Sequence, residues 1–211
     1  MKITIIYDNT VFQRGLKSDW GFSCLVEIYG KKILFDTGAN GAILLDNMKR
    51  LNIKPTEVKE VFISHYHWDH TGGLSDFLKV NPVKVYIPSS FKKLCIAKDV
   101  VIVKKSITIG ENIFSTGELN GVEQSLIVKT EKGVVIIVGC SHSGVGNILK
   151  AASQFGKPYA LIGGLHGFSD FDLVKGLTLI CPTHCTQHIS EIKSLYPEKY
   201  ISGGAGKVIM I

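Results

Sequence analysis

Short apolar runs alternate along the chain with polar and glycine-rich segments. Runs of about four to eight apolar or β-branched residues between turn-forming residues are typical of strands. This pattern predicts strands near 2–7, 22–29, 32–35, 60–64, 83–87 and 100–103, and a second group near 107–115, 122–130, 133–139, 158–163, 177–181 and 207–211. Helices are predicted at 40–51, 73–79, 89–98, 145–155 and 186–195. In the first helix, one face is formed by Ile43, Leu44, Asn47 and Leu51.

The two groups of strands predict the architecture. Each group is accompanied by helices, and the segment 122–138, with Glu131-Lys132-Gly133 in its middle, is typical of a hairpin. Sheets bury one face against each other and the other beneath helices, so we expect two packed sheets with helices outside. No linker separates the halves, and 211 residues with 45% hydrophobic content can bury a substantial core. The sequence therefore predicts an α/β (α+β) protein in which residues 1–211 form a single domain.

Composition indicates the cellular compartment in which we expect the protein. No run of about eighteen uninterrupted apolar residues occurs, so a membrane span is not expected. The chain reaches the acidic Asp8 too early for a signal peptide. The five cysteines, an odd number without paired spacing, argue against a disulfide framework and for the reducing cytoplasm. Cys181 and Cys185 flank His184, but no second cysteine pair completes a zinc finger.

The net charge bears on possible partners. A formal charge of +6 would attract an anionic small molecule or nucleic acid. The lysines are spread thinly, and no basic run with interleaved aromatics marks a nucleic-acid track. We therefore expect a small anionic substrate rather than nucleic acid, although general solubility accounts for the charge equally well. The oligomeric state is left open.

Residues 65–70 concentrate potential metal ligands. They read His65-Tyr66-His67-Trp68-Asp69-His70, directly after the apolar run 61–63. Imidazoles and a carboxylate crowded at a strand end lose solvation, and protonated histidines repel one another. A divalent cation removes both penalties, because neutral imidazole and carboxylate are its preferred ligands. Two metals fit better than one: His65 and His67 point the same way in extended chain, whereas Asp69 and His70 follow a bend and can face a second ion.

Three further histidines follow apolar runs that end in small residues. They are His142 after Gly139-Cys140-Ser141, His166 after Gly163-Gly164-Leu165 and His184 after Cys181-Pro182-Thr183. Strand ends that each deliver a histidine are typical of a site at one edge of a sheet. We predict a metal-binding or catalytic role for His142 and His184. For His166, such a role and a structural role both remain open.

The string His-x-His-x-Asp-His, followed by Thr71-Gly72-Gly73-Leu74, resembles the metallo-β-lactamase fold superfamily. Further segments agree along almost the whole chain: Tyr7-Asp8-Asn9, Trp20-Gly21-Phe22-Ser23, Phe35-Asp36-Thr37-Gly38, Thr116-Gly117-Glu118, Gly139-Cys140-Ser141-His142, Gly163-Gly164-Leu165-His166 and Pro182-Thr183-His184-Cys185-Thr186. Together they are similar to the branch that contains the dihydropterin-methyl-ribofuranosylaminobenzene-phosphate synthases of methanopterin biosynthesis and related metal-dependent hydrolases. The resemblance implies a four-layer αββα sandwich with its site at one sheet edge. Synthases of this branch are generally longer, with the shortfall here between Gly73 and residue 110.

The second half of the ligand set departs from the β-lactamase and glyoxalase pattern. Those proteins carry a histidine where this chain has Thr116-Gly117-Glu118, and a bridging aspartate where it has Cys140-Ser141-His142. We assign the missing histidine's role to His142 and keep Glu118 and Cys140 as alternative ligands. The predicted metal ligands are therefore His65, His67, Asp69, His70, His142 and His184.

Residues beside these ligands have more than one interpretation. Asp36 can cap a turn or hold the second nitrogen of a ligand histidine, and the family pattern favours the second role. Tyr66 and Trp68 can wall the pocket, stack on a flat ring or pack in the core. Gly72 and Gly73 are expected to let the loop turn tightly into a helix around the metals.

The expected chemistry follows from two divalent cations, with zinc favoured and iron or manganese as alternatives. Two such ions sharing a water lower its pKa towards neutrality and supply a bridging hydroxide. Asp69 would ligate the second metal and orient that nucleophile, and His166, if not a ligand, would protonate the leaving group or bind the substrate. We therefore predict a metal-dependent hydrolase, or related transferase, for a small anionic, phosphorylated or pterin-like molecule. The alternatives are a nuclease of the same fold and a non-catalytic metal-binding or sensing protein.

Overall fold

Two β-sheets lie face to face in the computed structural model, which describes residues 1–91, 97 and 99–211. Within these residues, the first sheet has seven strands in the order β13 (Val208–Met210), β1 (Lys2–Tyr7), β2 (Ser23–Ile28), β3 (Lys31–Phe35), β4 (Glu60–Phe62), β5 (Lys84–Pro88) and β6 (Val100–Val103). The described part of the second sheet has six strands in the order β12 (Leu179–Thr183), β11 (Pro158–Gly164), β10 (Gly133–Val138), β9 (Leu126–Thr130), β8 (Ile113–Gly117) and β7 (Lys105–Gly110).

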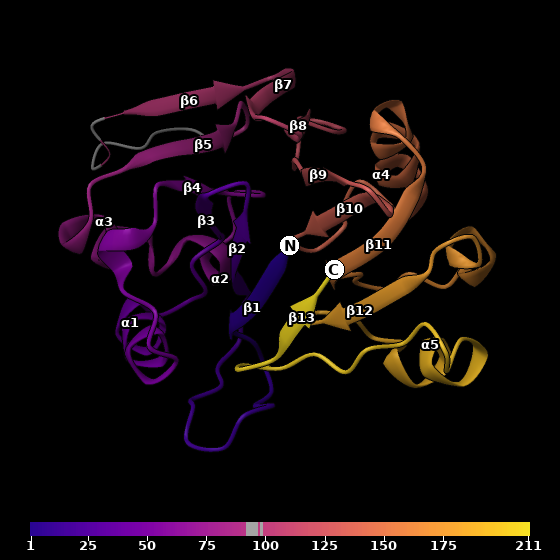
Figure 1. Ribbon diagram of the computed structural model, residues 1–211, viewed down its shortest axis with the longest axis horizontal. Coiled ribbons are helices and arrows are strands. Elements are labelled where there is room, and N and C mark those ends of the chain that lie inside the picture. Colours follow the sequence, from indigo (N-terminus) through magenta and orange to yellow (C-terminus); the bar gives the residue numbers. More distant parts are fainter. Residues whose placement is uncertain (92–96, 98) are drawn as a thin grey trace.

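Helices cover the outer face of each sheet. They are α1 (Gly41–Arg50), α2 (Trp68–Thr71) and α3 (Leu74–Val80) beside the first sheet, and α4 (Val145–Ala152) and α5 (Ile189–Leu195) beside the second (Figure 1). Short 3₁₀ turns follow at Pro55–Glu57, Ser153–Phe155 and Phe171–Val174. The expected four-layer αββα sandwich is confirmed. Among the described residues, no helix combines the length and the hydrophobicity needed to cross a membrane.

Three apolar clusters hold the layers together. The central cluster joins the inner faces of the two sheets and includes Phe22, Phe35, Phe62, Val135, Ile137 and Ile162. A second cluster packs α1 and α3 on the first sheet, and a third packs α4 and α5 on the second. Successive strand residues point to opposite faces, so strands covered on both sides are apolar throughout. This double burial explains the continuous apolar runs in the sequence.

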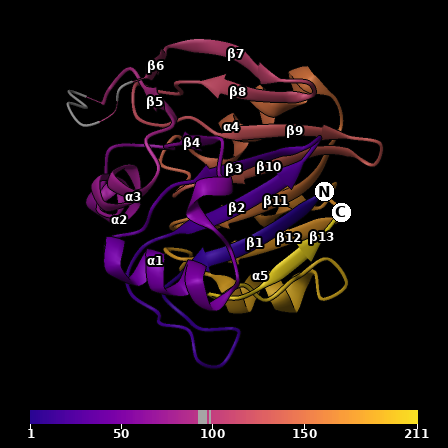
Figure 2. The ribbon, with the colours of Figure 1, turned by 60° about the vertical axis from the view of Figure 1, so that its left-hand side comes forward.

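Parallel strands bring the polar strand ends to one edge. In the first sheet β3 and β4 are parallel, and in the second β10, β11 and β12 are parallel. Asp36 and His65 therefore leave the first sheet at one end, and Cys140, His166 and His184 leave the second sheet after equivalent strand ends. Ligand sites in α/β sheets form beyond the carboxyl ends of parallel strands. Figure 2 shows the strands of the two sheets packed across each other.

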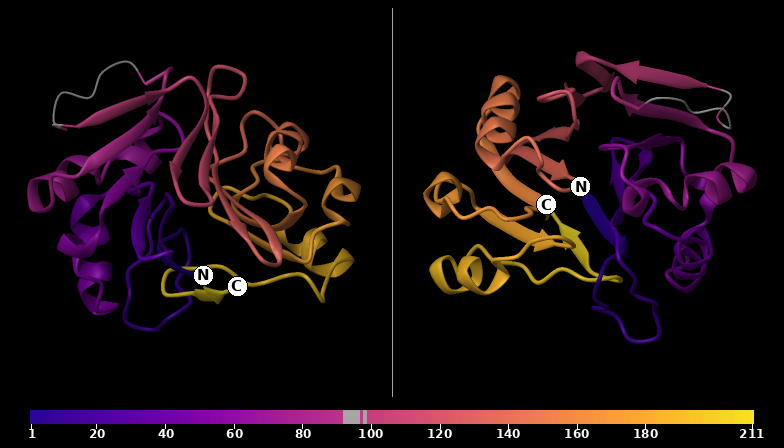
Figure 3. Two further views of the ribbon diagram at one scale, coloured as in Figure 1. Left: turned by 45° about the horizontal axis from the view of Figure 1, so that its top comes forward. Right: turned by 180° about the vertical axis from the view of Figure 1, so that it is seen from behind.

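The two chain termini meet at one edge of the first sheet. β13 pairs with β1 in antiparallel register, and the Met1 amino group donates to the Ile211 carbonyl at 2.9 Å. The last strand of the chain thereby returns to the first, and the views of Figure 3 show the two ends side by side.

Several predicted boundaries differ from the structure. The single strand predicted at 107–115 is wrong: β7 and β8 form an antiparallel hairpin whose turn places Asn112 at a φ of 56°. On α1 the buried residues are Gly41, Leu44, Asn47 and Met48, and Ile43 and Leu51 of the predicted face are only partly buried against the same cluster. The helix predicted at 186–195 begins only at Ile189. The helix predicted at 89–98 falls largely outside the described residues.

Candidate metal centre

Residues of the sheet edge adopt an unusual backbone conformation. Asp36, Ser141, His166 and His184 have φ values of 51°, 61°, 48° and 50°, in the left-handed region. Non-glycine residues rarely adopt this conformation, although aspartate and histidine tolerate it better than most. Such strain persists where the surrounding structure fixes it, and it gathers at functional sites. Each of these four residues lies within three residues of the end of a strand. At that point the chain turns sharply and enters a loop at the edge of the sheet.

The loop after β4 carries the first histidines. His65 is buried and pairs through a β-bridge with Glu123, and His67 immediately precedes α2. A Cβ at Gly72 or Gly73 would collide with the carbonyl oxygen of Ala39 or Thr37, respectively. Both glycines have helical φ values, so close packing rather than an unusual turn requires them. The expected tight turn at these glycines is therefore replaced by a close approach of two backbone segments.

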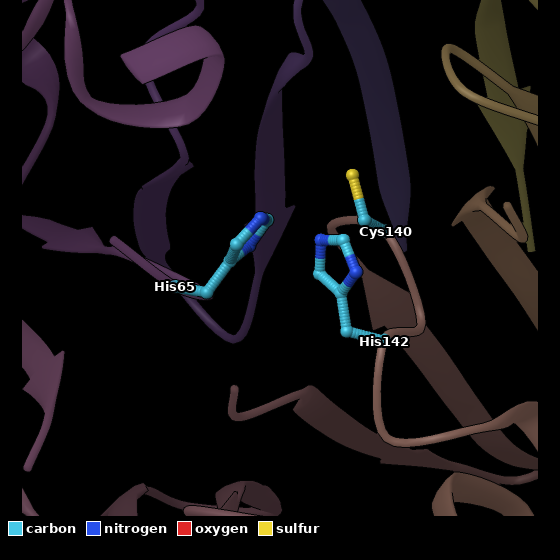
Figure 4. Close-up of side chains that lie close together, drawn as sticks. All are labelled: His65, Cys140 and His142. Atoms are coloured by element: carbon cyan, nitrogen blue, oxygen red, sulfur yellow. The ribbon is translucent and has the colours of Figure 1, made fainter. Parts of the chain in front are cut away.

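Two groups of side chains offer ligand atoms at short range. In the first group, the ligand atoms of His65, Cys140 and His142 all lie within 4.8 Å of one another. Figure 4 shows His65 on one loop facing Cys140 and His142 on the loop after β10. His67 adjoins this group, because its Nδ1 lies 3.0 Å from Nε2 of His65 and its ring centroid 4.8 Å from that of His142.

The second group lies on the other side of Cys140. The ligand atoms of His70, Cys140 and His184 lie within 4.8 Å of one another, and Nε2 of His70 is 3.1 Å from the Cys140 sulfur. Asp69 adjoins this group, with Oδ2 at 3.2 Å from Nε2 of His184. The same oxygen accepts a hydrogen bond of 3.0 Å from the Trp20 indole. All six predicted ligands thus gather around one cysteine.

Asp36 orients a histidine in each group. Its Oδ2 lies 2.7 Å from Nδ1 of His70 and accepts a hydrogen bond of 2.7 Å from the Ser64 hydroxyl. The Ser64 oxygen lies 2.9 Å from Nδ1 of His65. Because the serine proton is directed to Asp36, Nδ1 of His65 donates to the serine, and Nδ1 of His70 donates to the carboxylate. Both Nε2 atoms then carry a lone pair directed at the other candidate ligands, His67 and Cys140, and can bind a cation. This geometry supports the interpretation of Asp36 as a partner of ligand histidines.

Asn9 and Asp8 hold the His184 loop from the first sheet. Oδ1 of Asn9 lies 2.9 Å from Nδ1 of His184, and its Nδ2 donates to the His184 carbonyl at 2.9 Å. Asp8 Oδ1 accepts the His184 backbone N–H at 3.2 Å. His184, the first residue after β12, is therefore fixed by the loop after β1.

The charge states of the histidines suit a cation. Burial and neighbouring imidazoles lower the pKa of His65 well below its usual value and that of His142 to about 4. Burial also lowers the pKa of His70, but the Asp36 carboxylate outweighs it and raises that pKa. Burial raises the pKa of Asp69, whereas His184 and His70 lower it, and the net value is about 2. At neutral pH the imidazoles of His65 and His142 are therefore neutral, and the Asp69 carboxylate is ionised.

One buried atom tests whether a metal fits. Nε2 of His184 is buried and makes no hydrogen bond of regular geometry with the described residues, although Oδ2 of Asp69 lies 3.2 Å from it. A buried polar atom without a well-formed hydrogen bond is costly, and this one lies among nitrogen, sulfur and carboxylate donors. Imidazole, thiolate and carboxylate are the donors that zinc and related divalent ions bind. The residues present therefore fit a divalent metal at this position.

His166 and Glu118 are placed differently from these ligands. The His166 ring centroid lies 4.9 Å from that of His142, and both line a cavity of about 360 Å³ with Ser141, Gly144, Val145, Leu165, Gly167 and Phe168. Glu118 instead accepts the Ser90 backbone N–H at 2.6 Å and the Ser89 hydroxyl. The described ligand groups contain neither residue. Tyr66 and Trp68 are 53% and 65% exposed, which excludes the core role considered for them.

Sequence reasoning missed three residues that shape the site. Trp20 binds Asp69, Asn9 binds His184, and buried Glu123 accepts bonds of 2.8 and 2.7 Å from the Ser143 backbone and hydroxyl. Trp20 and Asn9 lie in segments that carry the family resemblance, so a signal for them existed. Glu123 had none, because it falls in a stretch that reads as an ordinary strand.

The comparisons with known proteins agree with this geometry. A family model described as the metallo-beta-lactamase superfamily matches residues 21–151. The chain is similar to 7,8-dihydropterin-6-methyl-4-(beta-D-ribofuranosyl)-aminobenzene-5'-phosphate synthase of Methanocaldococcus jannaschii, at 28% identity over 278 aligned residues covering 98% of this chain and 95% of the relative. An uncharacterised protein of the same organism is 27% identical over 258 residues, covering 99% and 100%.

A solved structure supports the same relationship. A protein described as a metal-dependent hydrolase of the beta-lactamase superfamily shares 27% identity, covers 100% of this chain and 99% of its own, and superposes with a TM-score of 0.82. These matches confirm the family resemblance seen in the sequence. The alignment with the synthase is 278 positions long, against 211 residues here, so that relative carries segments which this chain lacks.

Proposed function

The chain belongs to the metallo-beta-lactamase superfamily, and on that premise we propose a hydrolase, or related transferase, with a dinuclear metal centre and a small anionic substrate. Superfamily membership and the named relatives support a metal-dependent enzyme of this fold. One observation carries the proposal further: Cys140 belongs to two separate ligand groups, each with its own pair of histidines within 4.8 Å. Two sets of donors that meet at one residue support two ions rather than one.

Each proposed cation has its own residues. His65, His67 and His142 would hold one cation, and Asp69, His70 and His184 the other. These nitrogen and oxygen donors favour zinc and also accept iron or manganese. When bound, the pair of cations supplies a water of lowered pKa and stabilises negative charge that develops on a carbonyl or phosphoryl oxygen.

The chain's own residues would orient the reactants. The Asp69 carboxylate stays ionised at neutral pH, and Trp20 fixes one of its oxygens, so it can accept a proton or hydrogen bond from a water beside the metals. His166 lies exposed in the cavity next to His142. From that position its imidazole would bind an anionic group or donate a proton to the leaving group.

The proposed substrate class rests on charge and on the relatives. The chain has a formal net charge of +6, and two imidazoles line the cavity beside the ligand groups. The Methanocaldococcus jannaschii relative is named as a synthase of a dihydropterin phosphate compound. We therefore propose a phosphorylated or pterin-like small molecule, with a phosphodiester or related ester as the bond that is cleaved.

A substrate screen tests this function. Metal-loaded protein would be assayed with small phosphodiesters, thioesters, lactones, β-lactams and single-stranded RNA. We expect turnover of small phosphodiesters or related anions, abolished by His65→Ala and strongly reduced by His166→Ala. His188→Ala is the matched control, because that histidine lies on the surface and pairs with Glu191 at 3.1 Å. Efficient RNA cleavage with little turnover of small molecules, or no turnover in any class, would contradict the proposal.

A further inference from the structure

The geometry points to Cys140 as a thiolate ligand that is shared by both metal positions. This inference rests on the dinuclear centre proposed above and adds a seventh ligand to it. The superfamily pattern places a bridging aspartate at this point of the chain, whereas this chain has a thiol. Sulfur in place of a carboxylate changes which metals the site prefers and links the two ions through one atom.

Contacts on both sides of the sulfur carry the inference. Sγ of Cys140 lies within 4.8 Å of ligand atoms from His65 and His142 on one side, and from His70 and His184 on the other. Its distance to Nε2 of His70 is 3.1 Å. Among the residues that the structure describes, no other residue belongs to both groups.

The backbone on both sides of Cys140 is held in place by contacts of its two neighbours. A Cβ at Gly139 would collide with the Ser64 hydroxyl and lie 3.1 Å from Nδ1 of His65, so only glycine lets the two loops approach. The Ser141 hydroxyl donates to the Gly164 carbonyl at 2.8 Å. Between these fixed neighbours, Cys140 is 2% exposed.

The neighbouring thiol, that of Cys185, lies beside the Cys140 side chain and hydrogen-bonds with it. The Cys185 sulfur lies 3.9 Å from the Cys140 carbonyl oxygen and is only partly buried. It belongs to neither ligand group among the described residues. Cys185 is therefore the matched control for Cys140, since it is a second thiol at the same sheet edge.

A shared thiolate has two consequences. Sulfur is a soft donor, so the site should prefer zinc, cobalt or iron to manganese or magnesium. Binding replaces the thiol proton, which passes to solvent, with bonds from sulfur to both cations. Because each ion depends on the same atom, loss of the thiol should weaken both ions rather than one.

Cobalt(II) titration of the metal-free full chain tests the inference without an activity assay. A thiolate bound to cobalt gives a near-ultraviolet charge-transfer absorption that imidazole and carboxylate ligands do not give. We expect this absorption to increase through both equivalents of cobalt. It should disappear in Cys140→Ser and persist in Cys185→Ser. In Cys140→Ser both equivalents should bind more weakly by at least about tenfold, the loss that removal of a ligand's supporting partner already causes.

A second variant distinguishes loss of the thiolate ligand from a folding defect. Cys140→Asp restores the carboxylate of the superfamily pattern, and its fold is checked by circular dichroism. It should bind two ions without the charge-transfer absorption and shift its preference towards manganese. Absorption that stops after one equivalent would overturn the sharing of the sulfur. Two bound ions without the absorption in the wild-type chain would exclude Cys140 as a ligand and leave the dinuclear centre intact. Failure to bind cobalt would overturn both proposals.

Discussion

Oδ2 of Asp36 lies 2.7 Å from Nδ1 of His70, and both side chains are completely buried. Through Ser64 the same carboxylate also fixes the ring of His65, which belongs to the other ligand group. A single acidic residue after β3 therefore sets the orientation of one histidine at each proposed metal position.

Asp36→Asn should consequently weaken both ions. The amide lacks the negative charge that favours a Nδ1–H tautomer, and it cannot accept from Ser64 and His70 as the carboxylate does. We expect metal affinity to fall about 10- to 100-fold, measured by competition with a chromophoric chelator. Asp172→Asn, at an exposed acid, is the control. Equal affinities of Asp36→Asn and the wild-type protein would contradict this role.

Variants of His142 and Glu118 test which of these two residues takes the place of the missing superfamily histidine. His142→Ala should lower the bound metal and the activity, because its ring contacts His65 and His67 within the first group. Glu118→Gln should leave the bound metal unchanged, because its carboxylate bonds Ser90 instead. Inductively coupled plasma mass spectrometry gives the metal content of both variants. Loss of an ion from the glutamate variant alone would show that the alignment is wrong.

Glu123 should stabilise the loop that carries Cys140 and His142. Its buried carboxylate accepts two bonds from Ser143, and hydrogen bonds to charged groups contribute about 1.5–3 kcal/mol each. Glu123→Ala should therefore lower the free energy of unfolding by about 2 kcal/mol or more and reduce the metal affinity. Urea unfolding with and without metal measures both effects. Glu131→Ala, at the exposed turn between β9 and β10, should change neither quantity.

Asp8 gives a pH dependence with a defined sign. Burial raises its pKa from 3.8 to about 6, although the His184 backbone N–H and other nearby groups oppose the shift. Between these two values the folded protein keeps a proton that the unfolded chain has released. The free energy of unfolding therefore falls as the pH rises from 3.8 to about 6, and the loss persists above that range.

Asp8→Asn removes this titration and can keep the bond to the His184 backbone through its amide oxygen. In metal-free protein at pH 8, the variant should be more stable than the wild type by up to about 3 kcal/mol, and the difference should vanish near pH 4. Urea unfolding at several pH values gives the comparison. A stability difference that does not depend on pH would contradict the assignment of the effect to Asp8.

The sequence indicated the layers and most of the side chains that gather at the sheet edge for a physical reason. Strands buried on both faces are continuous apolar runs, and parallel strands deliver their following residues to one edge. The clustering of His65, His67 and His70 could be read from their spacing alone. The hairpin of β7 and β8 was missed although Gly110-Glu111-Asn112 is a turn signal, because the apolar residues on both sides of it were taken as one continuous strand.

The central position of Cys140 could not be read from spacing. It depends on how the two sheets pack, and on the close approach of Gly139 to Ser64, which joins residues far apart in the sequence. The roles of Asn9 and Glu123 depend on the same packing, because Asn9 bonds His184 from the other half of the chain and Glu123 forms a β-bridge with His65. Sequence periodicity describes one element at a time and carries no information on such contacts.

Metal stoichiometry tests the central claim most directly. Protein purified without chelator would be analysed for metal per chain, beside Asp69→Ala and His70→Ala. We expect close to two equivalents, mainly zinc, in the wild-type chain, and a loss of one equivalent or more in each variant. A single equivalent that is unaffected by replacing Asp69 or His70 would contradict the dinuclear centre.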